Sequence, residues 1–436
     1  MTHSEFITVL DWARQPDAVR AHLLRPAPGA ADAEAAAARI IEAVRTRGDH
    51  ALSEFTARFD GVQIPPDGFR VDPDALRAAC SSLPAPLRRA IRLAARRIRA
   101  FHKRQKPRNW NISEANGSRL TQRFLPVNRA AVYVPGGRAP LLSSVLMGVI
   151  PAQVAGVPEI VLASPPGPDG QPHGGILAAA HLLGVGEVWR VGGAQAIAAL
   201  ALGTRSIRPV DVIVGPGNQF VAAAKKLLFG SVGIESVAGP TDVTIVADDS
   251  ADPAWVAADM LAQAEHDPDA TALAILIGGA GLNAIVAELK AQTAAAPRRS
   301  IIEQSLARNG ALICVPGPDE AVQLVNLRAP EHLQVITRNP RPLAERMTGA
   351  AAVFIGPWSA EAIGDYVAGP NHTLPTGRTA RFASPLSVMH FMRAQHLVQM
   401  SREGTLAVGE AAATLAEAEQ LFAHAASIRR RMDRRT

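Results

Sequence analysis

Cysteine is scarce in this chain. Only Cys80 and Cys314 occur among its 436 residues, and neither belongs to a C-x-x-C pair or to a metal-ligand spacing. This scarcity excludes a disulfide framework and a cysteine-rich metal site, and it is typical of a cytoplasmic protein with reduced thiols. Cys314 ends an apolar run, which favours a place in the core over a role as nucleophile.

Aromatic residues and long apolar runs are also few. Aromatics make up 4% of the chain, which argues against a nucleic-acid platform built from stacked rings. Apolar stretches are broken by Gly, Pro or charge before they reach roughly 18 residues, so we predict no membrane span. Residues 1–15 lack a basic segment followed by an apolar one. We therefore expect no export signal and a cytoplasmic location.

The net charge of +6 is concentrated in a few segments. Residues 87–108 carry ten Lys and Arg, with apolar residues at helical spacing between them. This pattern indicates an amphipathic helix with a solvated basic face. No aromatic or glycine-rich nucleic-acid motif accompanies it, so we expect no nucleic-acid partner.

Short apolar segments alternate with helical patterns through the middle of the chain. A length of 436 residues indicates two or three domains. From about residue 124, predicted strands end in Gly or Pro and are followed by predicted helices, which is typical of a parallel sheet with crossover helices. The layout repeats from about residue 243, so the sequence predicts two successive α/β units. Residues 1–100 and the segment after about 387 are predicted to be mostly helical.

The stretch "LAQAEHDPDA" (261–270) contains a candidate metal site. Asp252 and Pro253 are strong helix-start signals, and the predicted helix runs to residue 267. Gln263 and His266, three residues apart, would then share a face and could reach one ion. The alternative is a polar helix end without a metal.

Glu331 and His332 follow Pro330 in "NLRAPEHLQV". On a short helix the two side chains would project about 100° apart and could flank a substrate as a pair of general bases. The alternative is a helical turn in which Glu331 only favours the positive N-terminus.

Two further candidates lie near the end of the chain. Asp365 and His372 lie in a Gly/Pro-rich stretch after a predicted strand, and carboxyl ends of parallel strands are where α/β proteins place their sites. Glu419 and His424 lie on the tail helix, about 140° apart in rotation, where they could embrace a ligand. The glycine loops lack a G-x-G-x-x-G dinucleotide fingerprint, because "GPGNQF" has Phe220 at the third glycine position.

Taken together, these motifs resemble one family. "AVYVPGGRAPLLSSVLM", "VGGAQAIAALALGT", "VDVIVGPGNQF", "QAEHD", "APEHL", "GDYVAGPNHTLPT" and "AEAEQLFAHAASIR" occur in the order found in the histidinol dehydrogenase family. The resemblance covers roughly residues 30–430 and is highly specific in its motifs.

The resemblance implies an activity, two cofactors and a set of site residues. Members oxidise L-histidinol to L-histidine in two NAD-dependent steps with one zinc ion per subunit, as homodimers whose tails complete the partner's site. The implied zinc ligands are Gln263, His266, Asp365 and His424. Glu331 and His332 match the two proton acceptors. The implied NAD contacts are Tyr133, Gln195 and Asn218. The implied substrate contacts are Thr241, Glu419, His332 and the four zinc ligands.

The resemblance also implies the architecture, an α/β fold with two incomplete Rossmann-like parallel-sheet domains and helical N- and C-terminal arms. We expect an N-terminal arm over 1–27 and a C-terminal arm over 387–436 that crosses to the partner. We expect a first domain formed by 28–132 and 243–386, which carries the metal and catalytic residues. A second domain on the NAD side is expected over 133–242.

Two departures from the family pattern bear on the substrate. The family usually reads "AGPSE" where this chain has Thr241 and Asp242, and Thr373 replaces a valine in "NHVLPT". A threonine keeps the hydroxyl donor and acceptor. An alternative therefore remains, a related dehydrogenase of another small polar alcohol such as a sulfonated propanediol.

Overall fold

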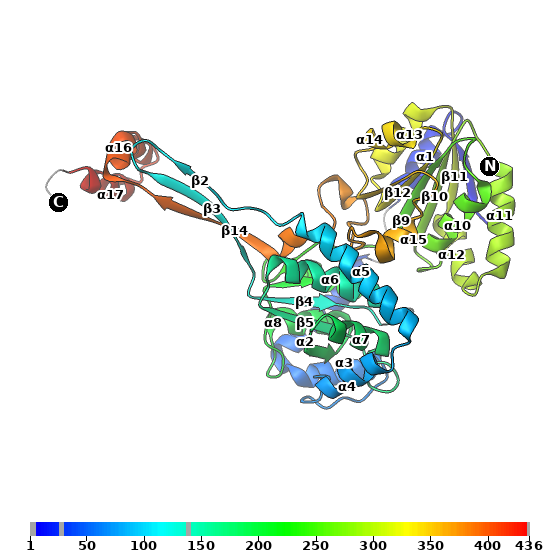
Figure 1. Cartoon of the computed structure of the whole chain (residues 1–436), viewed down its shortest axis with the longest axis horizontal. Coiled ribbons are helices and arrows are strands. Elements are labelled where there is room, and N and C mark those ends of the chain that lie inside the picture. The colour runs from blue at the N-terminus through cyan, green and yellow to red at the C-terminus, as the bar shows by residue number, and fades with distance from the viewer. Residues whose placement is uncertain (1–5, 26–29, 137–140, 434–436) are drawn as a thin grey trace. The chain divides into compact units, whose positions relative to one another are not determined.

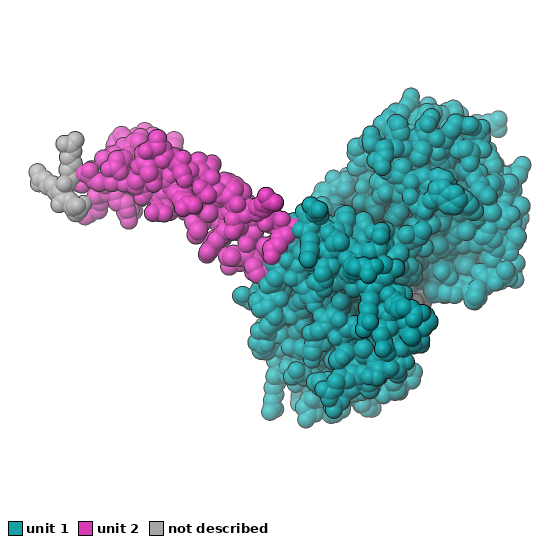
Figure 2. Space-filling model, viewed as in Figure 1, with its two compact units in different colours: residues 1–105, 127–391 teal, residues 106–126, 392–436 magenta. Residues whose placement is uncertain are grey.

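The computed structural model describes residues 6–25, 30–136 and 141–433. The chain divides into two compact units (Figure 2): unit 1 comprises residues 1–105 and 127–391, and unit 2 comprises 106–126 and 392–436. None of the helices within the described ranges has the length and apolar character needed to cross a membrane.

A five-stranded parallel sheet forms half of unit 1. Its central strand, β4 (Arg129–Tyr133), is followed on one side by β5 (Glu159–Ser164) and β6 (Glu187–Arg190), and on the other side by β7 (Val212–Val214) and β8 (Gly233–Ile234). From one edge of the sheet to the other, the strands are therefore the third, second, first, fourth and fifth in chain order. The order reverses between β4 and β7, which is where open α/β sheets place a ligand crevice.

Helices cover both faces of this sheet (Figure 1). Ala131 and Tyr133 face a core built with α8 and α9, whereas Val132 points the other way, against Gly148 of α6. The N-terminal helices form an outer shell: α2 and α3 pack on α8 and α9, α4 packs on α7, and α5 packs on α6. The bounds are α2 (Ala30–Arg47), α3 (Asp49–Phe59), α4 (Pro73–Ser81), α5 (Ala85–Lys103), α6 (Leu142–Ala155), α7 (Gly174–Leu182), α8 (Gly193–Leu202) and α9 (Gln219–Leu228).

A six-stranded parallel sheet forms the other half, in the order β1-β11-β10-β9-β12-β13. Its strands from β9 onward repeat the strand order of the first sheet. The sequence predicted two successive α/β units, but not this order. Helices α10, α11 and α12 pack on one face, and α1, α13 and α14 pack on the other. The strands are β1 (Thr8–Asp11), β9 (Asp242–Ala247), β10 (Thr271–Ile277), β11 (Ala311–Val315), β12 (His332–Ile336) and β13 (Ala352–Ile355). The helices are α1 (Pro16–Leu23), α10 (Pro253–Ala264), α11 (Leu282–Ala295), α12 (Arg299–Asn309), α13 (Pro318–Arg328), α14 (Pro340–Glu345) and α15 (Glu361–Ile363), with a π-helical turn η1 (Gly364–Ala368) after it.

Unit 2 is a small arm. Its antiparallel sheet contains β2 (Trp110–Ser113), β3 (Arg119–Pro126) and β14 (Met392–Gln399), and it is followed by α16 (Arg402–Ala418) and α17 (Phe422–Met432). The predicted fold class, α/β with two Rossmann-like parallel sheets, is confirmed.

The boundaries of these parts differ from those expected from the sequence. Residues 8–11, expected in a helical arm over 1–27, form an edge strand paired with β11. Helices α2, α3 and α4 pack on the helices of the five-stranded sheet rather than with 243–386, whereas α5 contacts both α6 and η1, and residues 106–126 join the C-terminal arm. The reason is pairing across long sequence distances, which local patterns do not reveal. The expected boundary between 27 and 28 lies outside the described residues.

Candidate active site

The site lies at the amino end of the six-stranded sheet. Asp242 opens β9 and His332 opens the neighbouring strand β12, with Glu331 directly before it. We had expected the chemistry at carboxyl ends of strands, because Asp365 follows β13 in sequence. That expectation is wrong for this sheet: after β13 the chain turns back, and Asp365 of η1 comes within 3.7 Å of His332.

The sequence predicted Glu331 and His332 on a short helix, but neither residue lies on one. Helix α13 ends at Arg328, and Ala329 takes a left-handed conformation with φ 48° as its C-cap. Pro330 has no N–H to extend a helix, and the chain enters the fully buried strand β12. The helical prediction failed because Pro330 was interpreted as a start signal where it follows a helix end.

Gln263 and His266 also differ from the expected geometry. Helix α10 begins as predicted, with Asp252 accepting a hydrogen bond from the N–H of Ala254 at 2.8 Å, but it ends at Ala264. Gln263 therefore lies in the last turn of the helix, and His266 lies in the turn beyond it. The helix end still directs both residues toward the amino end of the sheet.

A hydrogen-bond chain joins Gln263, Thr241 and Glu331. The Nε2 of Gln263 donates to the Oγ1 of Thr241 at 2.7 Å, and this hydroxyl donates to the Oε2 of Glu331 at 2.6 Å. The amide of Gln263 is thereby oriented, and its Oε1 is left buried without a hydrogen-bond partner among the described residues. A free, buried carbonyl oxygen is the atom with which Gln ligates a cation.

Asp242 holds both candidate bases in place. Its Oδ1 accepts from the N–H of Glu331 at 3.1 Å, and its own N–H donates to the Oε2 of Glu331 at 3.0 Å. Its carbonyl oxygen lies 3.1 Å from the Nδ1 of His332, which fixes Nδ1 as the protonated nitrogen. Arg328 pairs with the carboxylate of Asp242 at 3.0 Å and so balances its buried charge.

His332 thus presents Nε2 as its free nitrogen. This atom is buried and has no hydrogen-bond partner within the part of the chain that the structure describes. Three carboxylates surround the ring: Glu361 at 3.5 Å and Glu331 at 3.7 Å from Nδ1, and Asp365 at 3.7 Å from Nε2. An unpaired ring nitrogen in a buried site is the geometry a general base requires.

The pKa values fit acid–base work. Burial raises the pKa of Glu331 to about 7, although the neighbouring His332 acts in the opposite direction. Burial alone would lower the pKa of His332, but the surrounding carboxylates outweigh it and raise the pKa well above 6.5. A cation bound beside Asp365 would lower it again, because positive charge disfavours the imidazolium.

Asp365 and His266 are in the protonation states that a metal needs. Burial opposes ionisation of Asp365, but the imidazole of His332 outweighs it and lowers the pKa of Asp365. The pKa of His266 is lowered, chiefly by desolvation, although the side chain is exposed to solvent, so the direction of this shift is a weaker argument than that of Asp365. An ionised carboxylate and a neutral imidazole are the forms that bind zinc.

Glu361 is a site residue that we did not single out from the sequence. It is buried, and its Oε2 has no hydrogen-bond partner in the described ranges. With His332 and Asp365 it forms a group whose ligand atoms all lie within 4.8 Å of one another. The available signal was its position four residues before Asp365, about one helical turn. Asp242, noticed only as a departure from a family motif, was the other residue whose role we missed.

The residues expected to bind NAD lie at the carboxyl end of the five-stranded sheet. Tyr133 ends β4, and its hydroxyl accepts from the N–H of Gly193 at 3.0 Å. Gln195, in the first turn of α8, is buried, and its Oε1 has no partner among the residues described. Asn218 caps α9 by accepting from the N–H groups of Phe220 and Val221, each at 3.1 Å. Tyr133 and Asn218 follow β4 and β7, the neighbouring strands between which the strand order reverses. The glycine loop at 133–137 is described only as far as Gly136.

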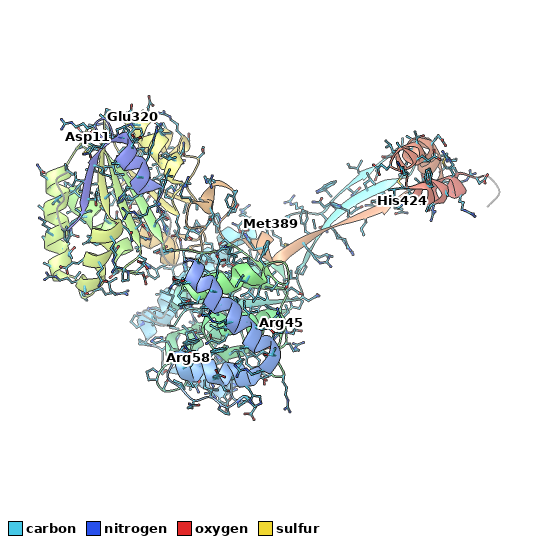
Figure 3. The ribbon with its side chains drawn as sticks, turned by 180° about the vertical axis from the view of Figure 1, so that it is seen from behind. Asp11, Arg45, Arg58, Glu320, Met389 and His424 are labelled. Carbon is cyan, nitrogen blue, oxygen red and sulfur yellow. The ribbon has the colours of Figure 1, made fainter. Side chains whose placement is uncertain are left out.

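Glu419 and His424 belong to unit 2. Glu419 is the C-cap of α16, and His424 lies in the first turn of α17 (Figure 3). Unit 1 thus contains every predicted site residue except these two.

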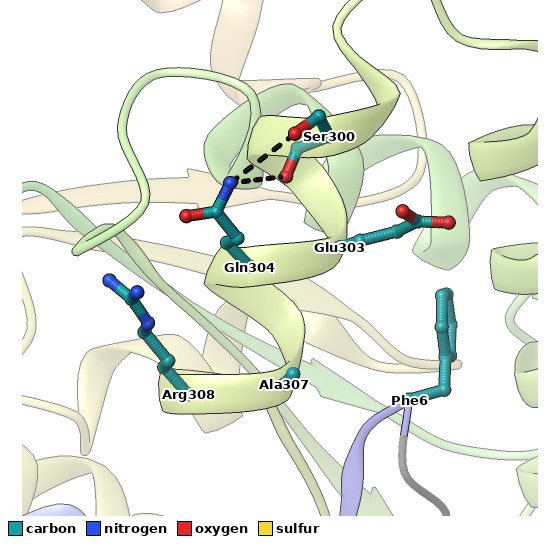
Figure 4. A pocket seen from close by; sticks show the side chains of 6 residues that line it. All are labelled: Phe6, Ser300, Glu303, Gln304, Ala307 and Arg308. Carbon is teal, nitrogen blue, oxygen red and sulfur yellow. Dashed lines mark hydrogen bonds between the residues drawn. The ribbon is translucent and has the colours of Figure 1, made fainter.

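An open depression beside α12 is unrelated to these residues. Figure 4 shows Ser300, Glu303, Gln304 and Arg308 projecting from this helix, with Phe6 nearby. The amide of Gln304 donates to the carbonyl and the hydroxyl of Ser300, within its own helix. No residue predicted to take part in catalysis or binding lines this depression.

The chain has two Rossmann-like sheets, and a buried carboxylate–imidazole pair lies at the amino end of one of them. This fold and this site define an α/β enzyme that works by acid–base chemistry. A model of the histidinol dehydrogenase family matches residues 23–432. The chain belongs to the histidinol dehydrogenase family and is an oxidoreductase.

Individual histidinol dehydrogenases also match this chain over most of its length. The histidinol dehydrogenase of Parasynechococcus marenigrum is 49% identical over 393 residues, which cover 90% of each chain. That of Ruegeria pomeroyi is 47% identical over 425 residues, 97% of this chain and 98% of the relative. The crystal structure of histidinol dehydrogenase from Elizabethkingia anophelis has a TM-score of 0.92 and 34% identity, and it covers 99% of both chains.

Proposed function

We propose that this protein oxidises L-histidinol to L-histidine in two NAD-dependent steps of histidine biosynthesis, with one zinc ion per site. The observation that carries the proposal is the buried base pair, Glu331 and His332, beside the free Oε1 of Gln263 and the ionised Asp365. Relatives 47–49% identical are histidinol dehydrogenases, so this substrate is favoured over another polar alcohol.

The residues present fit a zinc ion. Gln263, His266 and Asp365 would hold it in unit 1, with His424 supplied by the arm. Gln263 leaves a buried oxygen unpartnered among the described residues, and the pKa directions of His266 and Asp365 favour the ligating forms. When bound, the zinc would fix the amino and imidazole groups of the substrate, which orients its hydroxyl toward the bases.

The residues also fit a dinucleotide. Gln195 presents an unpaired buried oxygen after β6, and Ser164, at the end of β5, has a buried hydroxyl without a partner in the described chain. Buried polar atoms without partners are rare in folded proteins. Their position at the carboxyl ends of neighbouring strands is where a Rossmann-like sheet receives a dinucleotide.

His332 has the same task in both oxidations. Its Nε2 accepts the hydroxyl proton of the alcohol as hydride passes from the carbon to NAD, which gives the aldehyde. Water then adds to the aldehyde: Glu331 takes a proton from the water, and the protonated His332 gives its proton to the aldehyde oxygen, which forms the hydrate and leaves His332 neutral again. Glu331 releases its proton to solvent. His332 accepts a hydroxyl proton again as the second hydride leaves, which gives the carboxylic acid. No acyl-cysteine intermediate is needed.

The substrate can be tested directly. We expect the purified protein to form two NADH for each L-histidinol consumed, since alcohol to acid is a four-electron oxidation. A panel of small polar alcohols, including a sulfonated propanediol, provides the comparison. If one of these shows a higher kcat/KM than L-histidinol, the substrate assignment fails.

The arm supports a homodimer with shared sites. Among the described residues of unit 2, the buried apolar cluster consists of three alanines, Ala413, Ala416 and Ala425. Large apolar side chains of the arm are exposed instead: Val398 by 68%, Leu415 by 67% and Phe422 by 66%. A second copy of this chain would cover them and would place Glu419 and His424 at the other subunit's site.

Subunit exchange tests this arrangement. His332→Ala and His424→Ala proteins should each be inactive. If equal amounts are mixed and exchange randomly, half of the dimers combine the two variants, and each of these has one intact site. About one quarter of wild-type activity should therefore return.

A matched mixture is the control for this experiment. His332→Ala with Asp365→Asn should regain nothing, since both residues come from unit 1 of the same chain and no intact site forms. If exchange is demonstrated and the first mixture also stays inactive, the arm serves its own chain.

A further inference from the structure

A buried ion pair lies under the loop that follows β7. The Nζ of Lys225, in α9, is 2.6 Å from the Oε2 and 2.7 Å from the Oε1 of Glu235, which follows β8. Their side chains are 1% and 2% exposed. Neither residue belongs to the acid–base site described above.

Both members of the pair bond to the same residue, Gly215. Lys225 donates to the carbonyl oxygen of Gly215 at 3.1 Å, and the N–H of Gly215 donates to the Oε1 of Glu235 at 2.9 Å. The pair therefore fixes both polar groups of one residue, from a crossover helix on one side and from the adjacent strand end on the other.

Gly215 is the residue at which the chain leaves β7, at the carboxyl end of the sheet where we propose that NAD binds. Its φ of 120° is one that only glycine adopts readily, and a Cβ there would lie 2.0 Å from the carbonyl oxygen of Tyr133. The turn is thus pressed against the end of β4, and three residues later Asn218 caps α9. Small rotations of the Gly215 peptides would move Asn218 and the helix N-terminus together.

Stability alone does not explain the pair. Taking two charges out of water is costly, and apolar residues of similar volume at such positions are often as stable or more so. Apolar side chains cannot, however, bond to the N–H and the carbonyl of a glycine held in an unusual conformation. What the charged pair adds is a fixed peptide orientation.

We infer that Lys225 and Glu235 are positioning residues for the dinucleotide, which act by locking the turn at Gly215 and thereby the position of Asn218. This inference rests on the proposed NAD site. It predicts that removing the pair weakens dinucleotide binding even where the fold is kept.

The test compares the wild type with the double variant Lys225→Met/Glu235→Leu, which removes both charges at once. We expect far-UV circular dichroism to be unchanged, the Kd for NADH, measured by its fluorescence, to rise roughly tenfold or more, and zinc content to stay at the wild-type level. A folded double variant with the wild-type Kd would overturn the inference. A wild type that binds no NADH would overturn the proposed NAD function instead.

Two further variants complete the experiment. Arg129 and Glu187 form an ion pair at the opposite, amino end of the same sheet, so Arg129→Met/Glu187→Leu is the matched control and should keep the wild-type Kd. An equal loss there would also overturn the inference, since the effect would then be a general loosening of the sheet. If the first double variant does not fold, Lys225→Met/Glu235→Gln replaces it. The amide oxygen can still accept from Gly215, so we expect a smaller but measurable rise in Kd, and no rise refutes the inference.

Discussion

Replacing Glu331 by Gln should separate the two oxidations. We expect complete turnover to histidine to fall by ~10²–10⁴-fold, the usual cost of losing a general base. The first hydride transfer, followed as a single-turnover NADH burst, should be affected much less, because water is activated only after the aldehyde has formed. The change keeps the size of the side chain and a hydrogen-bonding group, so the loss reports on basicity.

His332→Asn should slow both steps, because each oxidation must lose a hydroxyl proton. The matched control is Glu361→Gln, a second buried carboxylate beside His332. Glu361 acts through His332, which serves both oxidations. Glu361→Gln should therefore change the burst rate and the turnover rate by the same factor and leave their ratio unchanged. If Glu331→Gln slows the burst as severely as turnover, or spares both, Glu331 is not the base that activates water.

The pH dependence gives an independent check on the same residue. Only the ionised carboxylate can accept a proton, and the pKa of Glu331 is raised by burial to about 7. The rate of the aldehyde step should therefore rise with pH and reach half its maximum near pH 7. Glu331→Gln should remove the part of this rise that belongs to Glu331, so that any rise that remains reports on deprotonation of His332, whose pKa is also raised.

Removing the metal should abolish turnover. We expect dialysis against a chelator to eliminate NADH formation with L-histidinol, and stoichiometric zinc to restore it, because the substrate's polar groups would otherwise have no anchor beside the bases. Full activity in protein shown to be metal-free by elemental analysis would contradict the zinc assignment.

Metal content can also distinguish two possible ligand sets. The set implied by the family uses Gln263 and His266 with Asp365, whereas Glu361 and His332 also lie within reach of Asp365. His266→Ala should reduce zinc affinity by more than the roughly 10–100-fold typical of losing an outer-shell partner. Glu361→Gln should retain zinc. The opposite result would assign the ion to His332, Glu361 and Asp365.

A matched variant guards against a general effect of altering a buried amide. Gln334 is a second fully buried glutamine, on β12 of the same sheet. Gln334→Leu should leave zinc content unchanged, whereas Gln263→Leu should lower it. Equal losses in the two variants would indicate loosened packing rather than a lost ligand.

The sequence predicted the α/β class and the repeated layout because these depend on local apolar periodicity. It did not predict that residues 8–11 form a strand, since β1 depends on pairing with β11, some 300 residues later, and on packing of Leu10 into the core around that sheet. It also missed that β3 joins β14, because half-exposed strands carry a weak apolar pattern.

The same distinction between local patterns and long-range contacts applies to the site residues. Gln263 and His266 were found because a helix start signal and a spacing of three residues were visible locally. The roles of Asp242 and Glu361 were not, because each depends on what its atoms meet in space: the backbone of Glu331 in one case, and the ring of His332 in the other. Pro330 misled us for a related reason, since the conformation of Ala329 decides whether a helix ends or begins there.

The interleaved path of the chain has a consequence for its synthesis. The five-stranded sheet and its outer helices use residues 30–234, so this half can fold while the rest is still on the ribosome. β1, made first, has no strand partner until β11 is complete, and β3 can pair at once with β2 but not with β14, which is made near the end of the chain. β1 and one edge of β3 thus stay unpaired while much of the chain is made. Their capture by chaperones, or by a neighbouring chain, competes with native pairing until β11 is made in the case of β1, and until β14 is made in the case of β3.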